Sequence, residues 1–532
     1  MILDIKIEKN REMRCYETIL ATTAVWLGRR FEMMFSQFWK FDLIEDSKHK
    51  PQLIGERITL DTAGDDILLL EQYHGIKVRS YDPMLIDNST IMQTIYTEIN
   101  KGYPICTSIK GENIPWSFSN EKQNYYPFLI VGYDDTEQNV YCLDVHYLNE
   151  VSKIPYEVFL LGYRGMQTFS ISHDEYSTLD WRGIISKITC KLNNSDAFRK
   201  MKEVSNFLRN AHNYMICNRE NLNTGDIDLV EKIQNLHRSR FLFSRTLDYF
   251  VNYHNAKPLK EYSEKFIKIS DRWLCIWTII NKSIYKNNFE AKREIVAEKI
   301  NELAELEENV CKQLTNIIDT SDDLTFIQVE NNDDILEDLE VVQLEGKDVC
   351  YIDISAYFNN KGFSLNLNSN SKADLTGIEE FILAEGLPNN QYWDINNIKF
   401  QFPILTDTDN DNISCSKQSI SFPEGQYSYI VFVGCAEWGN QSAELVLNYC
   451  EENVEVVTFN MSDWSLSTPL YGESVVWEGN SYHRTKSGIE LIEWFKGHIF
   501  AKVIKLKNEK KLDSITLPDC NNIHIFSLSL YK

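Results

Sequence analysis

An acidic run in the middle of the chain separates two parts with different hydrophobic periodicity. Between Asp319 and Asp348 there are eleven acidic residues and one lysine, a net charge of −10. Before this run, over residues 196–318, apolar residues recur every three or four positions, which predicts helices. After it, over residues 349–532, short alternating apolar segments between Gly, Pro, Asn and Asp predict β-strands. The run therefore indicates a linker between a helical part and a β part.

A chain of 532 residues is too long for a single hydrophobic core, so we predict a multidomain α+β protein. The predicted parts are a mixed α and β domain, a helical domain, an acidic linker and an all-β sandwich of the jelly-roll kind, over residues 1–192, 193–319, 320–348 and 349–532. The lysine- and glutamate-rich faces of the helical part are typical of a solvated scaffold.

The first 192 residues alternate between the two periodicities. Residues 128–144 read as two apolar strands around a polar turn, which predicts an antiparallel hairpin that ends in an acid. Strands are also predicted over residues 74–82 and 105–109, and Ile91, Ile95 and Ile99 mark one face of a helix.

A cysteine begins the first predicted helix. In residues 15–28, Tyr16, Ile19, Leu20, Thr23 and Leu27 fall on one helical face, and Gly28 marks the end of the helix. Cys15 therefore lies at a helix N-terminus, where a thiol pKa is commonly lowered and backbone N–H groups can stabilise an oxyanion. The alternative is that Cys15 is only a small apolar residue of the core.

Three segments together resemble a known family. Residues 15–28, Gly132-Tyr-Asp-Asp and Tyr141-Cys-Leu-Asp-Val are similar to the N-terminal domain family of butirosin biosynthesis protein H, a relative of bacteriocin-processing cysteine peptidases. The resemblance runs to about residue 320 and implies a papain-like fold. It implies acyl transfer from a carrier-protein thioester to an amine, with Cys15 as nucleophile and Asp144 as the orienting acid. An acyl or peptidyl carrier protein and other enzymes of natural-product biosynthesis (nonribosomal peptide or aminoglycoside) are the implied partners.

The sequence departs from this family at the position of the base. The hairpin of the family begins with His six residues before the Gly of Gly-Tyr-Asp, where this chain has Tyr126, and a shift by one residue gives Pro127. His146, two residues after Asp144, and His74 are the substitutes that the sequence offers. Two functions stay open at this point: a cysteine acyltransferase or hydrolase, and a degenerate domain that binds or assembles partners without catalysis.

An amide side chain precedes the cysteine helix. Asn10 lies five residues before Cys15, about where papain-like enzymes place an oxyanion donor. The alternative for Asn10 is an ordinary loop residue.

Charge, hydropathy and cysteine usage exclude several classes. A net charge of −24 disfavours nucleic acid and anionic membrane surfaces as partners. The densest apolar run, at residues 273–280, is too short to span a membrane, and the N-terminus carries charges where a signal peptide is apolar. Twelve cysteines without a C-x-x-C pair suit a reducing compartment, so we expect a cytoplasmic protein without a metal. The absence of a Gly-rich phosphate loop predicts no nucleotide cofactor.

The C-terminal part resembles the β-sandwich modules that are appended to bacterial glycosidases. The similar pieces are Phe402-Pro, Asp411-Asn-Ile, Ser421-Phe-Pro-Glu-Gly, Ser462-Asp-Trp and His524-Ile-Phe. The resemblance implies a glycan-like ligand, on which Trp438, Trp464 and Trp477 would stack, and the alternative is that these rings are structural.

Three aspartates in this part have the spacing of a calcium loop. Asp407, Asp409 and Asp411 alternate, but the sixth position is not Gly and the twelfth is Gln418 instead of Glu. The sequence therefore favours a turn with solvated carboxylates over a calcium site.

Overall fold

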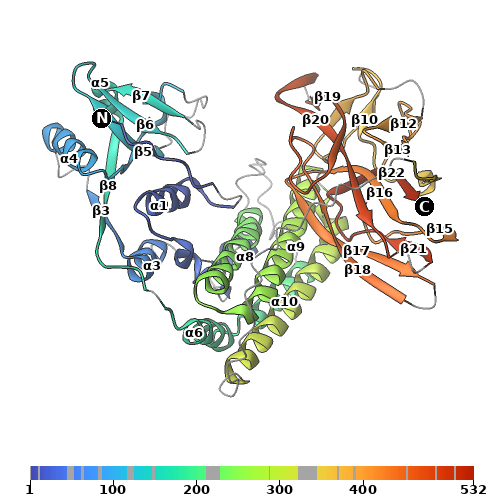
Figure 1. Ribbon diagram of the computed structural model, residues 1–532, viewed down its shortest axis with the longest axis horizontal. Helices are drawn as coiled ribbons and strands as arrows, with labels where there is room; N and C mark the ends of the chain where they lie inside the picture. Colours follow the sequence, from blue (N-terminus) through green and yellow to red (C-terminus); the bar gives the residue numbers. More distant parts are fainter. Residues whose placement is uncertain are drawn as a thin grey trace.

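The computed structural model has three parts that follow one another along the chain (Figure 1). A sheet with helices forms the N-terminal region, long helices lie in the middle, and a β-sandwich forms the C-terminal part. The residues that the structure describes are 2–9, 12–44, 53–60, 65–81, 87–116, 125–145, 150–176, 178–210, 228–286, 288–320, 344, 346–367, 371–387, 391–450, 453–485, 488–507 and 511–532. The predicted multidomain α+β class, with its order of mixed, helical and β parts, is confirmed.

The N-terminal region is built on an antiparallel sheet. Within the described residues its strands follow the order β3-β8-β4-β5-β6-β7. Their bounds are β3 (Ile76–Tyr81), β8 (Tyr163–Ile171), β4 (Ile105–Lys110), β5 (Tyr125–Asp134), β6 (Asn139–Leu143) and β7 (Val151–Pro155). Strands β5 and β6 form the predicted hairpin, with Leu129 opposite Leu143. The sequence predictions for this hairpin, β3 and β4 are confirmed.

Further helices and two short strands belong to the N-terminal region. They are α1 (Cys15–Trp26), α2 (Ile54–Arg57), α3 (Asp65–His74), α4 (Asn88–Asn100) and α5 (Tyr156–Gly162), together with the short η1 (Glu32–Phe35), η2 (Gly111–Asn113) and strands β1 (Asp42–Leu43) and β2 (Ile58–Thr59). Ile91, Ile95 and Ile99 of α4 are buried as the sequence predicts. The β5 strand contacts both α1 and α4.

The middle of the chain is helical, as predicted. Its helices are α6 (Trp181–Asn194), α7 (Ala197–Asn210), α8 (Asp228–Tyr253), α9 (Lys260–Tyr285) and α10 (Phe289–Thr320), with a single turn, η5 (Lys257–Leu259), between α8 and α9. In Figure 1, α8, α9 and α10 lie side by side between the N-terminal region and the sandwich. None of the helices in the described part of the chain is long and apolar enough to cross a membrane.

The C-terminal part is a β-sandwich. One sheet has the order β10-β11-β19-β20-β16-β22-β14, with β9 also paired to β22, and the other has the order β15-β21-β17-β18, as far as the described residues show. The bounds of the first sheet are β9 (Val349–Ile352), β10 (Phe363–Ser364), β11 (Glu380–Leu383), β14 (Ile413–Ser414), β16 (Tyr429–Ala436), β19 (Ser474–Arg484), β20 (Ile489–Lys505) and β22 (Ile523–Tyr531). Those of the second are β15 (Ser419–Gly425), β17 (Gln441–Tyr449), β18 (Asn453–Met461) and β21 (Leu512–Thr516), beside the hairpin β12 (Tyr392–Ile395) and β13 (Ile398–Gln401) and the turn η7 (Ser355–Tyr357).

Two hydrophobic cores account for the packing of the described residues. The first runs from Leu3 to Leu314 and contains side chains of both the N-terminal region and the helices. The second runs from Leu344 to Tyr531 and belongs to the sandwich. The sequence-based boundary at residue 192 falls within α6, so the first two parts share one core there. Most of the predicted linker lies outside the described residues.

The sandwich is attached to α9 by polar and aromatic contacts. Lys282 forms an ion pair with the fully buried Glu437, and Asn522 Nδ2 donates to Thr278 Oγ1 at 2.8 Å. The ring of Trp438 packs edge-on against Trp277 with 5.2 Å between centroids. The contact is therefore a specific interface between two separate cores.

The separate core predicts that the sandwich folds by itself. We expect a fragment of residues 344–532 to give a β-type circular dichroism spectrum and one cooperative thermal transition, because it keeps Leu344 and the rest of its core. The fragment lacks Lys282, the ion-pair partner of Glu437. It keeps His524, whose Nε2 lies 3.1 Å from Glu437 Oε1, so the Glu437 carboxylate still has a partner. An insoluble or unfolded fragment would mean that the sandwich depends on α9.

Candidate functional site

Cys15 occupies the first position of α1, as predicted. The Glu17 side chain caps this end, where its Oε2 accepts the backbone N–H of Arg14 at 2.8 Å. Arg238 of α8 also donates to Glu17 Oε2, which ties α8 to the first turn of α1. The other end of α1 terminates before Gly28, whose φ of 69° is readily adopted by glycine. The predicted end of the helix is therefore confirmed.

Helix α1 is more deeply buried than one apolar face requires. Every residue from Glu17 to Ala24 is buried, because α1 packs on β5 and is also joined to α8. Cys15 itself is half-buried at the helix end, so its thiol lies at the margin of the core.

The surroundings of Cys15 favour the protonated thiol. Burial raises the pKa of the Cys15 thiol, and the negative charges of Asp144 and Glu17 raise it further, against the lowering effect of a hydrogen bond to its own backbone N–H. The net shift of the Cys15 pKa is opposite to the lowering that a helix N-terminus alone would give, because burial, and after it the two carboxylates, outweigh the backbone N–H. A catalytic role for Cys15 therefore needs a group that removes its proton.

Asp144 is the buried acid at the end of the hairpin. It directly follows β6, and the indole Nε1–H of Trp116 donates to its Oδ2 at 2.8 Å. Burial is the main cause that raises the pKa of the Cys142 thiol, and the Asp144 charge raises it further. The Asp144 charge also acts on the Cys15 thiol, and an indole holds the carboxylate in place.

Tyr126 lies near the start of β5. Leu129 pairs with Leu143, so extending this register by one residue sets Phe128 opposite Asp144. Because side chains alternate along a strand, Tyr126 lies on the same sheet face as Phe128 and is a diagonal neighbour of Asp144. Tyr126 is partly buried against the core. A side chain at this position can therefore reach toward the acid.

Asn10 and His146, two of the predicted site residues, lie outside the described residues. His74, the other substitute base that the sequence offers, has partners other than Cys15. His74 is fully buried, and its Nε2 accepts the backbone N–H of Met33 at 3.1 Å while Nδ1 lies 2.8 Å from Glu175 Oε1. The His74 imidazole thus joins η1 to the chain after β8.

No sequence pattern points to Trp116 or Arg238 as part of the site. Trp116 lies just after η2, outside any periodic segment, and Arg238 is one of many charged residues on a helix. Their roles are seen only in their hydrogen bonds to Asp144 and Glu17, which form only in the folded chain. Among the described residues, no group of three or more His, Cys, Asp and Glu side chains is arranged to hold a metal ion.

The tryptophans of the sandwich have structural contacts. Trp464 is buried, and Trp477 packs on Phe363 with 5.4 Å between ring centroids. Trp438, besides its contact with Trp277, donates its Nε1–H to the Thr376 carbonyl at 3.0 Å. These contacts fit the alternative that the three rings are structural. A glycan-like ligand stays a prediction.

The aspartate turn differs from the one predicted. Asp409 is exposed, but Asp411 is fully buried, and the backbone N–H groups of Gly362 and Phe363 donate to its carboxylate at 2.8 and 3.0 Å. Lys361 Nζ lies 3.8 Å from Asp411 Oδ2 and donates to backbone carbonyls of the same turn. The prediction of solvated carboxylates is therefore wrong for Asp411, because an ammonium group occupies the centre of the turn.

Comparison with known proteins identifies the C-terminal part only. No curated protein matches the chain. Residues 348–532 match a family described as an AziU2-like beta-sandwich domain, and this range begins where the predicted acidic linker ends. The chain thus carries a C-terminal AziU2-like β-sandwich domain behind an N-terminal sheet region and a set of long helices.

Proposed function

We propose that the N-terminal region is a papain-like domain that catalyses cysteine-dependent acyl transfer, with Cys15 as the nucleophile. The observation that supports this most is the effect of a buried acid: the Asp144 carboxylate, held by Trp116, acts electrostatically on a thiol at the first turn of α1. The proposed substrate is an acyl group on a carrier-protein thioester, or a peptide, in natural-product biosynthesis. This substrate class rests on the resemblance of residues 15–28 and of the β5–β6 hairpin.

The proposed reaction has two steps. The Cys15 thiolate attacks the thioester carbonyl, the carrier thiolate leaves and takes up a proton, and an acyl-enzyme forms. An amine, or water, then attacks this acyl group, the acyl carbon–sulfur bond breaks, and the proton that the nucleophile loses passes to the base as the Cys15 thiolate is released. The backbone N–H groups at the start of α1 are suited to the oxyanion of each tetrahedral intermediate.

The electrostatics define what the base must do. Burial, and after it the Asp144 and Glu17 carboxylates, oppose formation of the Cys15 thiolate by raising the pKa of its thiol. An imidazolium between Cys15 and Asp144 reverses this, because it neutralises the acid and stabilises the thiolate. The proposed base is His146, which follows Asp144 by two residues in the sequence.

A direct test is the formation of an acyl adduct. Incubation of the full chain with aminoacyl thioesters, on a carrier protein or on a small thiol, should give an acyl adduct that peptide mapping assigns to Cys15. Cys15→Ala should abolish the adduct and keep the fold. Cys190→Ala, at an exposed thiol of α6, is the matched control and should leave the adduct unchanged. An adduct that persists in Cys15→Ala would contradict the proposal.

A second candidate is a non-catalytic scaffold that binds carrier proteins or biosynthetic enzymes. It is favoured by one observation, the raised pKa of Cys15, together with Tyr126 at the position of the family histidine. In that case, neither thioester should acylate Cys15, and alkylation of Cys15 at pH 7 should be no faster than that of Cys190.

A further inference from the structure

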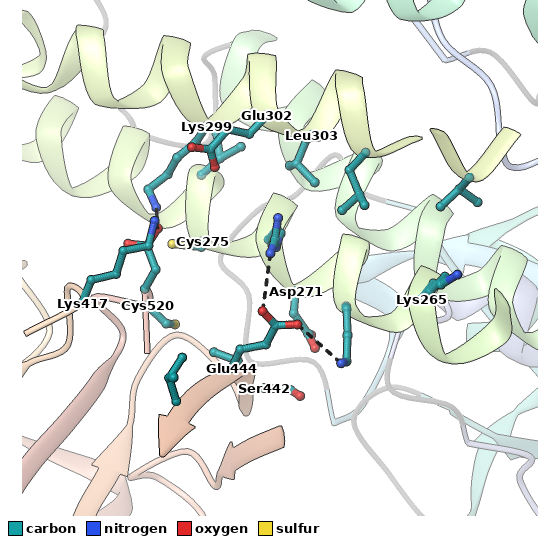
Figure 2. A pocket seen from close by; sticks show the side chains of 18 of the residues that line it. Lys265, Asp271, Cys275, Lys299, Glu302, Leu303, Lys417, Ser442, Glu444 and Cys520 are labelled. Carbon is teal, nitrogen blue, oxygen red and sulfur yellow. Dashed lines mark hydrogen bonds and ion pairs between the residues drawn. The ribbon is translucent and has the colours of Figure 1, made fainter. Parts of the chain in front are cut away.

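A cavity of about 510 Å³ lies at the interface between the helices and the sandwich. Its walls are side chains of α9 and α10 on one side and of β17, β21 and the loop after β21 on the other (Figure 2). A volume of this size is typical of pockets that hold small organic molecules. The cavity therefore has room for a ligand that touches both the helices and the sandwich.

Much of the cavity wall is apolar. Leu303, Leu306 and Val310 of α10 fall on one helical face, and all three line the cavity. Ile276 of α9 and Val446 of β17 line it as well. These side chains form a surface against which the apolar body of a ligand can pack, because burial there removes hydrocarbon from water.

Two cations at this cavity share one carboxylate. Lys268 and Arg272 lie one turn apart on α9, and both face Glu444 of β17. Lys268 Nζ is 3.6 Å and Arg272 Nη2 is 4.0 Å from the Glu444 carboxylate, and both distances are longer than a normal hydrogen bond. All three side chains are about half-exposed. An anion can therefore enter here from solvent and accept hydrogen bonds from both cations.

A second shared carboxylate at the cavity is already bound closely. Asp519 Oδ2 lies 2.7 Å from Lys299 Nζ and 3.1 Å from Lys417 Nζ, so both of these ion pairs have the length of hydrogen bonds. Figure 2 shows Lys299 and Lys417 at one end of the cavity, apart from Glu444. The cations beside Glu444 are thus the better position for a further negative charge.

The charge of the lining sets the charge of a matching ligand. Among the described residues that line the cavity, five are cationic and four are acidic, so their net charge is +1, whereas the whole chain carries −24. This local excess of cations attracts an anion within an acidic protein. A ligand with one negative charge would neutralise the lining.

We propose that the cavity binds a small monocarboxylic acid with an apolar body. The ligand carboxylate is held between Lys268 and Arg272, and its body lies against the apolar side chains of α9, α10 and β17. Because the ligand contacts both sides of the interface, its binding strengthens the attachment of the sandwich to the helices. The site is separate from Cys15 and does not depend on the chemistry proposed there.

Titration of the full-length protein with decanoate at pH 7, followed by isothermal calorimetry, tests the proposal. We expect one saturable site per chain. Octanoate, which has two methylene groups fewer, should bind roughly tenfold more weakly because it buries less apolar surface. Octan-1-ol, which has the same chain as octanoate but no charge, should bind more weakly than octanoate.

Substitutions locate the ligand carboxylate. Lys268→Met and Arg272→Met remove a charge but keep an apolar chain, so each should weaken decanoate binding about tenfold. Glu444→Gln should instead strengthen binding by up to about fivefold, because the carboxylate that competes for both cations is gone. Lys260→Met, at an exposed position of the same helix, is the matched control and should leave the affinity unchanged.

Four results would overturn the proposal. Decanoate does not bind, or it binds Lys268→Met and Arg272→Met as tightly as the wild-type protein, or octan-1-ol binds as tightly as octanoate. The fourth is a Glu444→Gln variant that binds decanoate as weakly as the two methionine variants, since the ion pairs would then serve only the interface. Circular dichroism of each variant establishes that it is folded, so that a changed affinity reflects the site.

Discussion

Replacing Glu307 by alanine should destabilise the protein by about 3 to 5 kcal/mol, because it leaves a buried guanidinium without its counter-charge. Glu307 and Arg240 are both fully buried, and Arg240 Nη2 lies 2.9 Å from Glu307 Oε2. The indole N–H groups of Trp39 and Trp273 each donate to the same carboxylate at 2.8 Å. One side chain of α10 therefore satisfies groups from the N-terminal region, α8 and α9.

Urea unfolding followed by tryptophan fluorescence measures this loss, since two of the rings contact Glu307 directly. Glu308→Ala is the matched control: the neighbouring carboxylate forms surface ion pairs with Lys202 and Lys312, and its removal should cost less than about 1 kcal/mol. Equal losses for Glu307→Ala and Glu308→Ala would show that the buried network adds no stability. Arg240→Met combined with Glu307→Leu should cost less than Glu307→Ala alone, because no buried charge is then left.

This network also shows what the sequence could and could not predict. The alternation in residues 128–144 and the spacing of Ile91, Ile95 and Ile99 predicted a hairpin and a helix face correctly, because both patterns are local. Glu307 lies in a helix with many glutamates, and the local pattern predicts that its side chain is exposed to solvent like theirs. Its burial depends on Trp39, which is 268 residues away, and only the folded chain brings the two together.

In the candidate sites, too, local features were predicted and contacts between distant residues were not. Cys15 at a helix N-terminus and Asp144 at the end of a hairpin were predicted from local pattern, and in the structure the Asp144 charge acts on the Cys15 thiol. Trp116, which holds Asp144, has no sequence signal. Likewise, Cys275 and Cys520 are single cysteines in unrelated segments, and only the folded chain places both in the wall of one cavity. The sequence around Asp411 predicts a solvated turn. Asp411 is buried because Lys361, fifty residues earlier in the sequence, places its ammonium group beside the Asp411 carboxylate.

The second large effect is expected from Tyr126→His. The new imidazole would be a diagonal neighbour of Asp144, whose carboxylate would accept a hydrogen bond from it and hold it as a cation. A cation beside Cys15 lowers the pKa of its thiol, whereas the wild-type surroundings raise it. Alkylation of Cys15 at pH 7 should therefore increase by more than about tenfold, with a lower midpoint in its pH–rate profile. Tyr126→Phe, which removes the hydroxyl without adding a base, should leave the rate near that of the wild type.

Asp144→Asn decides what this acid does in the natural chain. If Asp144 acts on Cys15 only as a negative charge, the amide should lower the pKa of the thiol and speed alkylation, because one of the two carboxylates that raise this pKa is gone. If Asp144 instead orients a base such as His146, the same substitution should slow alkylation, and His146→Ala should slow it as much. The amide oxygen can still accept the Trp116 N–H, so the carboxylate charge is the main change. A faster rate in Asp144→Asn, with no effect of His146→Ala, would assign the N-terminal region to the scaffold function.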